Sequence, residues 1–344
     1  MKRGKAVIVG AGALGLGFLA ERMAQGYDLC LADTSAKSDI LSRLKREQCF
    51  AVNVCGLDGI AVMKVIGSFE TAIVGTAEGR EILARAVLEA DLILTATERK
   101  ALRKVVDEIA PVLNARLTKA WLLFCENGLN IAKAYAPSFG AQTVLVDTVM
   151  SRMCRFARPG ETSYEPMWTG GEALVTEAYD YLPLDADLCS PGPFNPVFSM
   201  VCRADFSCWE DMKLYLHNGV HAFISYHAFL EGVRFFKDTP APIRERARQV
   251  LLQEVVPAIV QTHPSADEKK VQQYGLELLE RFFSPYFNDS IERGIRGIEE
   301  KLAPDERLVG GCAYIKRAGI EPTLYATTID AGRKIQCLQR SQER

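Results

Sequence analysis

Hydrophobic runs alternate with amphipathic stretches through the first half of the chain. Short apolar runs that predict buried strands lie at residues 6–9, 29–32, 92–94, 120–125 and 144–146. Stretches with helical periodicity lie between them, at residues 13–25, 38–46, 81–89 and 99–113. A G-L-D-G turn at residues 56–59, between two strand-like pieces, predicts a hairpin. Because strands that alternate with helices are typical of parallel sheets, the pattern predicts an α/β domain with a doubly wound, Rossmann-type sheet.

The pattern changes after residue 190. Residues 190–196 (S-P-G-P-F-N-P) gather the breakers that mark a domain boundary. Beyond them the periodicity is helical, over residues 209–230, 242–261, 266–283 and 289–302. We therefore expect two domains, an α/β domain over residues 1–193 and a mostly α-helical domain over residues 194–344. A cleft between two domains is a common place for a small-molecule site.

Charge and hydropathy narrow the kind of partner. The net charge at pH 7 is −2, whereas nucleic acids and anionic membranes attract proteins through a concentrated positive field. No apolar run reaches the ~18 residues of a membrane span, and the N-terminal residues do not fit a signal peptide. We therefore expect a cytoplasmic protein with a small-molecule partner, present as a monomer or a homodimer.

Ten cysteines raise the question of disulfides or zinc. The chain contains no C-x-x-C pair, and the spacings match no zinc pattern. Several of the thiols, such as Cys30 and Cys125, lie in apolar strand-like runs, where cysteine acts as a small hydrophobic residue. We therefore expect reduced, mostly structural thiols and no bound metal.

The motif G-A-G-A-L-G directly follows the first predicted strand and opens a helix. This context gives the G-x-G-x-x-G pattern its meaning as a dinucleotide-binding turn. Gly10 permits the tight turn, Gly12 lets the backbone approach a pyrophosphate, and Gly15 lets the helix pack close to the strand. The helix start then offers free N–H groups to the anion. The predicted cofactor-binding residues of the turn are Gly10, Gly12, Ala13, Leu14 and Gly15.

An acidic residue follows at the end of the second strand. Asp33 lies where a carboxylate accepts hydrogen bonds from the adenosine ribose, and it would repel a 2′-phosphate. The turn and Asp33 together predict NAD rather than NADP as the cofactor. Lys37 lies close by and would partly offset this preference. FAD uses the same turn, but the chain shows no second flavin motif.

One helical stretch concentrates chemistry. With Lys213 set at 0° on an α-helical projection, His217 lies at ~40°, Glu210 at ~60°, His221 at ~80° and Asn218 at ~140°. Polar groups thus share one arc beside an otherwise apolar run. A solvent-facing polar stripe would produce the same pattern. Lys213 and His221 are also ~12 Å apart along the helix axis, so both reach one substrate only if the lysine stem extends towards the imidazole.

At these residues the chain resembles the polyol-specific long-chain dehydrogenases (the mannitol dehydrogenase family), most closely the mannitol-1-phosphate 5-dehydrogenase branch. The K-x4-N-x2-H motif is present as Lys213, Asn218 and His221. C-E-N at residues 125–127 and V-D-T-V-M-S-R-M at residues 146–153 resemble further family motifs, as do R-F-F-S-P-Y at 281–286 and P-D-E-R-L at 304–308. The resemblance spans nearly the whole chain.

The resemblance implies a metal-independent oxidoreductase in which Lys213 is the acid–base group. That role requires a lysine pKa below the usual ~10.4. Asn127 and Asn218 would hydrogen-bond the substrate oxygen and stabilise the developing alkoxide. His221 would hold the reactive hydroxyl. Glu210 would be either a proton-relay carboxylate or a plain salt-bridge partner.

Other residues bear on the substrate. Arg293 and Arg296, three apart on the predicted helix 289–302, would share a face and clamp a phosphate or carboxylate, or else form a solvated basic face. Asp147, in the V-D motif, is a further expected substrate contact. Four positions depart from the family pattern, and they loosen the assignment of a phosphorylated substrate: Ser151 for Asp, Ser284 for Asn, Ile298 for Pro and Glu300 for Arg.

The sequence thus predicts an NAD-dependent dehydrogenase that interconverts a sugar alcohol and its ketose, with mannitol 1-phosphate and fructose 6-phosphate as the first choice. Two alternatives within the same chemistry are a hexuronate reductase, acting on fructuronate or tagaturonate, and a mannitol 2-dehydrogenase. A third is a dinucleotide-binding regulator without turnover, against which the intact lysine, asparagine and histidine set argues.

Overall fold

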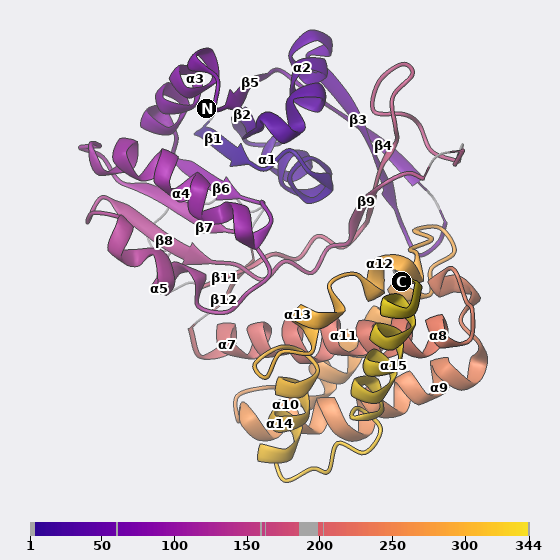
Figure 1. Ribbon diagram of the computed structural model, residues 1–344. Coiled ribbons are helices and arrows are strands. Elements are labelled where there is room, and N and C mark those ends of the chain that lie inside the picture. Colours follow the sequence, from indigo (N-terminus) through magenta and orange to yellow (C-terminus); the bar gives the residue numbers. More distant parts are fainter. Residues whose placement is uncertain are drawn as a thin grey trace. The chain divides into compact units, whose positions relative to one another are not determined.

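The computed structural model describes residues 4–59, 61–158, 160–161, 163–185, 199–201 and 203–342. The chain separates into two compact units, Met1–Arg203 (unit 1) and Ala204–Arg344 (unit 2), shown from indigo to magenta and from orange to yellow in Figure 1. Each unit has hydrophobic cores of its own. The predicted boundary between residues 193 and 194 lies outside the described residues.

A six-stranded parallel sheet forms the centre of unit 1. Its order is β5-β2-β1-β6-β7-β8, which reads 3-2-1-4-5-6 when these strands are counted along the chain. This is the order of doubly wound dinucleotide-binding sheets, and it confirms the predicted fold class. The strands are β1 (Gly4–Val9), β2 (Tyr27–Thr34), β5 (Phe69–Val74), β6 (Leu92–Thr95), β7 (Ala120–Phe124) and β8 (Thr143–Asp147).

Both faces of this sheet are buried, which explains its near-continuous apolar strands. In β1, Ala6 and Ile8 face one core while Val7 and Val9 face the other. Helices α3 (Ala77–Glu89), α4 (Arg99–Asn114) and α5 (Ile131–Tyr135) cover the second core. The helix at 13–23, which includes η1 (Gly15–Ala20) and α1 (Glu21–Met23), covers the first core together with α2 (Ser38–Glu47). Short 3₁₀ turns are η2 (Ser35–Lys37) and η3 (Ala136–Ser138).

The predicted hairpin around residues 56–59 is confirmed and belongs to a second sheet. Strands β3 (Cys49–Cys55) and β4 (Ala61–Gly67) pair antiparallel. The sheet continues as β4-β3-β10-β9, with β9 (Cys154–Phe156) and β10 (Leu174–Glu177), which the sequence did not predict. A buried ion pair between Arg152 and Glu21, 3.0 Å apart, ties the start of β9 to the helix after the glycine turn. Strands β11 (Pro183–Asp185) and β12 (Ser199–Val201) form a small parallel pair.

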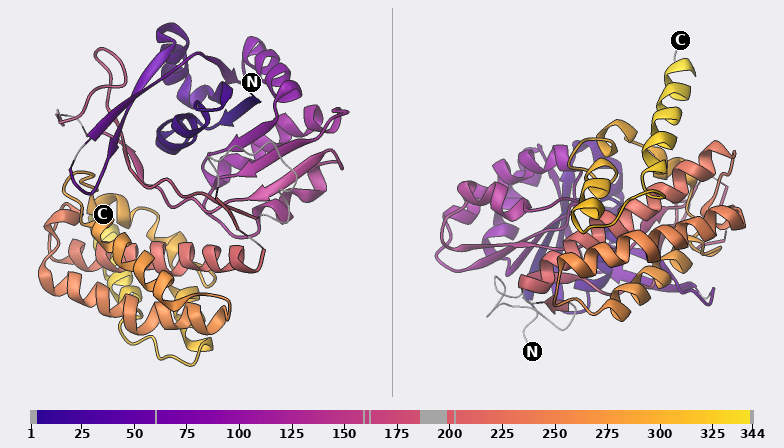
Figure 2. Two further views of the ribbon diagram at one scale, coloured as in Figure 1. Left: turned by 180° about the vertical axis from the view of Figure 1, so that it is seen from behind. Right: turned by 90° about the horizontal axis from the view of Figure 1, so that it is seen from below.

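Unit 2 is α-helical over its described residues. A long helix runs through α7 (Arg203–Asp211), η4 (Met212–Asn218) and α8 (Gly219–Leu230). A second helix, formed by α9 (Ala241–Gln249), η6 (Val250–Val255) and α10 (Val256–Thr262), packs along it, and so does α11 (Glu268–Phe282), as Figure 2 shows. Helices α12 (Ile291–Ile295) and α15 (Thr327–Gln342) pack on α8. The remaining elements are η5 (Phe236–Asp238), α13 (Ile298–Lys301) and α14 (Val309–Arg317).

The prediction of one helix over residues 289–302 is wrong. Ser290 caps α12 through its hydroxyl, but the helix ends at Ile295 because Arg296 is extended. Gly297 then adopts a positive φ of 61°, a conformation that favours glycine, and α13 begins after it. The two short helices therefore run in different directions instead of sharing one face.

The eight cysteines that the structure describes are free thiols, while Cys189 and Cys202 lie outside the described residues. Among the described residues, no group of three or more His, Cys, Asp or Glu side chains is arranged so that it could hold a metal ion. Over the same residues, no helix has the length and apolar character needed to cross a bilayer.

Candidate functional site

The glycine turn between β1 and the first helix is closely packed at two positions. Gly10 has a φ of 130°, and a Cβ there would lie 2.4 Å from the carbonyl oxygen of Ala96. A Cβ on Gly15 would lie 1.8 Å from the carbonyl oxygen of Gly10. Both approaches are closer than a side chain allows. The backbone itself therefore requires glycine at these positions, in agreement with the expected tight turn and helix–strand contact.

Gly12 is different, because a Cβ there would meet no atom within 4 Å. The space beside it is open, and Gly12, Ala13 and Leu14 are only partly buried. Among the described residues no side chain caps η1 at Leu14, so the first turn of this helix can offer N–H groups to an anion. An open cradle beside uncapped amides fits the pyrophosphate of a dinucleotide.

Asp33, near the end of β2, lies against this turn. One carboxylate oxygen accepts a hydrogen bond from the backbone N–H of Ala11 at 2.7 Å, and the other accepts from the N–H of Thr34 at 2.7 Å. The side chain remains partly exposed. The carboxylate is therefore held beside the expected position of the adenosine ribose. Lys37 follows in η2.

A buried carboxyl group joins the carboxyl ends of β6 and β7. Glu126 is 5% exposed and accepts hydrogen bonds from the Thr95 hydroxyl at 2.8 Å and the Thr97 N–H at 2.9 Å. Burial raises the pKa of Glu126, and these hydrogen bonds partly offset that effect. Asn127 follows directly and is exposed. Sequence reasoning noted Glu126 only as part of a motif; its buried contacts position the loop that carries Asn127.

Asp147 ends β8 and has a structural contact. Its carboxylate accepts a hydrogen bond from the backbone N–H of Ala132 at 2.9 Å, in the first turn of α5. Burial raises the pKa of this group, whereas the amide hydrogen bonds from α5 lower it. The carboxylate therefore holds the start of α5, and its expected substrate contact stays a prediction.

A π-helical turn carries the predicted acid–base residue of unit 2. In η4 the hydrogen bonds join residues five apart, so Lys213 and Asn218 lie one above the other. Asn218 and His221 are then three apart at the start of α8, where they are neighbours on the helix surface. The three residues thus form one row, although an α-helical projection separates Lys213 from Asn218 by ~140°. All three are partly buried, as is Glu210.

His221 is surrounded by aromatic rings and one carboxylate. Its ring centre lies 4.5 Å from that of Phe236 and 5.1 Å from that of Phe282. Its Nε2 is 3.8 Å from an oxygen of Asp289, which is 2% exposed. Burial lowers the pKa of His221, while Asp289 raises it. The net direction favours the neutral imidazole, which can both donate a hydrogen bond to a hydroxyl and accept one.

His217 is more deeply buried, at 4% exposure. Burial is the main reason that its pKa lies well below the usual range, and the charges of Lys213 and Arg281 lower it further. Its Nδ1 has no hydrogen-bond partner within the described residues. The ring contacts Phe282 edge to face.

Each of the two arginines expected to clamp an anion is paired with a carboxylate four residues before it in the chain. Arg293 lies in α12 and pairs with Asp289 at 3.3 Å. Arg296 follows the end of that helix, pairs with Glu292 at 3.6 Å, and is 72% exposed. Their joint contact with an anionic substrate stays a prediction.

Lys301 and Arg307 are two further cations of unit 2 that the sequence analysis did not select. The ammonium of Lys301, at the end of α13, donates a hydrogen bond to the carbonyl of Gly294 at 2.6 Å. Its pKa is lowered to about 8, first by burial and then by the charges of Arg307 and Arg293. Arg307 itself is paired with Glu306 at 3.4 Å. No helical periodicity connects residues 301 and 307; their family-like stretches were the only signal.

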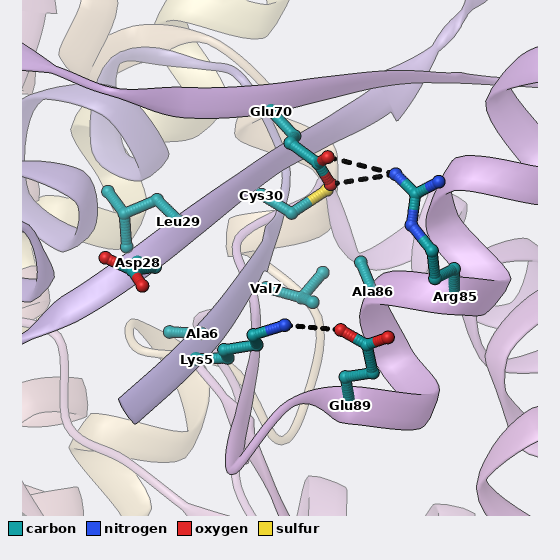
Figure 3. A pocket seen from close by; sticks show the side chains of 10 residues that line it. All are labelled: Lys5, Ala6, Val7, Asp28, Leu29, Cys30, Glu70, Arg85, Ala86 and Glu89. Atoms are coloured by element: carbon teal, nitrogen blue, oxygen red, sulfur yellow. Dashed lines mark hydrogen bonds and ion pairs between the residues drawn. The ribbon is translucent and has the colours of Figure 1, made fainter. Parts of the chain in front are cut away.

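Unit 1 contains a cavity of about 340 Å³ (Figure 3). It is at the amino ends of β1, β2 and β5, whereas doubly wound sheets bind ligands at the carboxyl ends. Two ion pairs border it, Lys5 with Glu89 and Arg85 with Glu70. Burial raises the pKa of the Cys30 thiol in its wall to about 12, which keeps it an unreactive thiol. This cavity therefore does not contribute to the candidate site.

Comparisons with known proteins agree with this arrangement. Residues 4–139 match the family model of the mannitol dehydrogenase Rossmann domain, and residues 205–332 match that of the mannitol dehydrogenase C-terminal domain. The chain is 24% identical to mannitol-1-phosphate 5-dehydrogenase of Pseudarthrobacter chlorophenolicus, over 95% of this chain and 84% of that protein. It is 21% identical to the enzyme of that name from Emericella nidulans, over 99% and 88%.

Solved structures share the fold. A ternary complex of Pseudomonas fluorescens mannitol 2-dehydrogenase with NAD and D-mannitol has a TM-score of 0.71 at 16% identity, over 96% of this chain and 78% of that one. A D-sorbitol dehydrogenase in substrate-free form has a TM-score of 0.74 at 12% identity, over 96% and 80%. Since the two family models together span most of the sequence, the chain belongs to the mannitol dehydrogenase family.

Proposed function

We propose that the protein is an NAD-dependent oxidoreductase that interconverts a polyol and its ketose, with mannitol 1-phosphate and fructose 6-phosphate as the pair. The row formed by Lys213, Asn218 and His221 carries the proposal, because it places an amine, an amide and a neutral imidazole side by side. Family membership and the named relatives support this reaction class.

The glycine turn is the proposed cofactor site. Gly10, Gly12, Ala13, Leu14 and Gly15 form an open, uncapped helix start that suits the pyrophosphate. Asp33 accepts from Ala11 and is placed to receive the ribose hydroxyls, which favours NAD over NADP. The neighbour from Pseudomonas fluorescens was solved with NAD. When bound, NAD accepts the hydride that leaves the carbinol carbon.

The protein groups would handle the proton and the oxygen. Lys213, in its neutral form, would take the hydroxyl proton as the carbonyl forms, and would return it during ketone reduction. Asn218 and Asn127 would donate hydrogen bonds to the oxygen as negative charge develops there. His221, which burial keeps neutral, would hold the hydroxyl, and Asp289 would orient its ring. Glu210 would relay the proton from Lys213 or pair with it.

One observation keeps a second candidate in view. Lys301 and Arg307 suit any anionic substrate end, and a carboxylate is as good a partner as a phosphate. A hexuronate reductase would use the same lysine chemistry on a keto acid. An unphosphorylated polyol, by contrast, would leave Lys301 without an anionic partner among the described residues, while Arg307 would keep Glu306.

The purified protein should reduce NAD with one substrate of a panel that contains mannitol 1-phosphate, mannitol, altronate and mannonate. We expect mannitol 1-phosphate to be the best substrate of this panel. The reaction is measured as the increase in NADH absorbance. Lys213→Ala should abolish turnover, while NADH binding, measured by fluorescence, stays intact. Full activity in Lys213→Ala would refute the mechanism. NADH binding without turnover of any panel member would instead support a regulatory protein.

A further inference from the structure

The side chain of Tyr325, two residues before α15, reaches the end of the π-helical turn η4. It is fully buried, and a Cβ added to Gly219, the residue directly after that turn, would lie 2.0 Å from its hydroxyl oxygen. A Cβ added to Gly311 in α14 would lie 2.6 Å from the same oxygen. One turn further along α14, Tyr314 stacks on Tyr215 of η4, with 4.3 Å between the ring centres. The two glycines thus leave the space that the phenol end occupies between η4 and α14.

The helical hydrogen-bond ladder is interrupted beside this phenol. In an α-helix the N–H of Gly219 would bind the carbonyl of Tyr215, but here it donates to the carbonyl of Leu216. The Tyr325 hydroxyl lies 3.5 Å from the Tyr215 carbonyl oxygen and donates its hydrogen to the nearer carbonyl oxygen of Arg307. Burial raises the pKa of the phenol well above its usual range, so the hydroxyl keeps that hydrogen. A polar group therefore lies beside the carbonyl that the π turn releases from the regular ladder.

The backbone of Tyr325 is fixed by a buried carboxylate from a second π-helical turn, η6. Glu254 in this turn is 4% exposed, and its two oxygens accept hydrogen bonds from the N–H groups of Leu324 and Tyr325, each at 2.8 Å. The hydroxyl of Thr323 donates to the same carboxylate at 3.1 Å. Tyr325 is therefore held at its main chain by η6 while its ring end contacts η4.

We propose that Tyr325 is a positioning residue, whose phenol end holds η4 in the π-helical form that aligns Lys213 with Asn218. This inference rests on the proposed function, in which the amine and the amide meet the same substrate oxygen. A π turn leaves one carbonyl outside the ladder, and a buried carbonyl without a partner costs free energy. A polar group at that carbonyl lowers this cost. Without it, the segment would relax towards a regular α-helix, which turns the amine away from the amide.

The first test removes the hydroxyl and keeps the ring. In Tyr325→Phe, kcat for the best substrate of the panel should fall by about 10- to 100-fold, because a small misplacement of an acid–base group has that effect. The Kd for NADH should stay within about twofold of the wild type, since the proposed cofactor turn lies in unit 1. Deuterium on the carbinol carbon should slow kcat more than in the wild type, because hydride transfer then limits the rate.

Tyr226→Phe is the matched control for this substitution. Tyr226 is fully buried in α8, and its hydroxyl has no hydrogen-bond partner among the described residues. Loss of that hydroxyl should leave kcat within about twofold of the wild type and the isotope effect unchanged. A fall in kcat that is specific to Tyr325→Phe would therefore not be a general effect of changing the core of unit 2.

Gly219→Ala tests the same contact from the helix. The new methyl group would lie 2.0 Å from the Tyr325 hydroxyl oxygen and 2.8 Å from its Cζ, so kcat should fall by at least about tenfold. In the double variant with Tyr325→Phe the closer of these contacts is gone. The double variant should therefore be at least about threefold more active than the product of the two single losses predicts.

Amide hydrogen exchange tests the contact without turnover. In Tyr325→Phe, the amides of residues 212–219 should exchange about tenfold faster than in the wild type, because the turn opens more often. The amides of α3 in unit 1 should be unchanged, and Tyr226→Phe should leave residues 212–219 as slow as in the wild type.

The outcomes separate this inference from the proposed function. Wild-type kcat in Tyr325→Phe would overturn the inference, whether or not exchange in η4 becomes faster, and the proposed function would stand. Equal losses of kcat in Tyr325→Phe and Tyr226→Phe would overturn it as well. If the wild-type protein oxidises no member of the panel, the proposed function fails, and the exchange rates alone decide whether Tyr325 holds η4.

Discussion

Two alanine substitutions, three residues apart in one turn, should have opposite effects. In Gly12→Ala the new methyl group meets no atom within 4 Å, and the backbone at this position is not left-handed. In Gly15→Ala the methyl group would lie 1.8 Å from the carbonyl oxygen of Gly10. The first change fills space that only a ligand would use, whereas the second disturbs the folded chain itself.

The geometry sets the size of each effect. Real side chains essentially never bring Cβ closer than 3.0 Å to such an atom, so in Gly15→Ala the helix must move by about 1.2 Å, the difference from 1.8 Å. Overpacking of this kind costs about 2–4 kcal/mol of unfolding free energy. Gly12→Ala restricts the unfolded chain and should add about 0.4–1 kcal/mol. Its methyl group should nevertheless weaken NADH binding at least about tenfold, because the backbone can no longer approach the pyrophosphate.

Urea unfolding and NADH fluorescence titration measure the two quantities separately. We expect Gly12→Ala to keep the wild-type midpoint or exceed it while its Kd for NADH rises. Gly15→Ala should show a lower midpoint. The reasoning is refuted if Gly12→Ala binds NADH as tightly as the wild type, or if the two variants are destabilised equally.

Three further outcomes are expected. Asp33→Asn, which keeps an acceptor for the Ala11 N–H but removes the charge, should reduce the preference for NAD over NADP on the order of tenfold, measured as the ratio of kcat/KM values. Because burial lowers the folded-state pKa of Lys301 from 10.5 to about 8, the protein should gain stability between these pH values in urea titrations, since only the unfolded chain still holds that proton. A flat profile would contradict this assignment. Glu21→Gln should cost about 2–4 kcal/mol of unfolding free energy, because it leaves Arg152 with Asp180 as its remaining carboxylate partner, while the exposed Glu89→Gln serves as control and should leave the urea midpoint nearly unchanged.

Local patterns predicted unit 1 well. Alternating apolar runs indicated the parallel strands, and the G-L-D-G turn indicated the β3–β4 hairpin. These features depend on residues close in the sequence. The pairing of β10 with β3 joins residues over 100 positions apart, as in Val175 opposite Asn53, and no periodicity reports such a contact. The second sheet was therefore only half predicted.

The site in unit 2 shows the same division. The row of Lys213, Asn218 and His221 came from a family motif, while its geometry depends on a π-helical turn that an α-helical projection cannot represent. One helix was predicted over residues 289–302 because the periodicity is continuous there, whereas Gly297 interrupts it after Arg296. Lys301 lies beyond this glycine, so helical spacing did not report the hydrogen bond that it donates to Gly294.

The π-helical turn η4 makes the chemistry sensitive to chain length as well as to residue type. A π turn holds one residue more than the α-helical ladder around it would accept. Removal of one residue between positions 214 and 217 would leave Lys213 and Asn218 four apart on a regular α-helix, where they would still be neighbours on one face. If the segment instead became α-helical without losing a residue, the amine and the amide would lie ~140° apart on the helix. The five-residue spacing of the motif is therefore matched to the π-helical turn, and the two would have to change together.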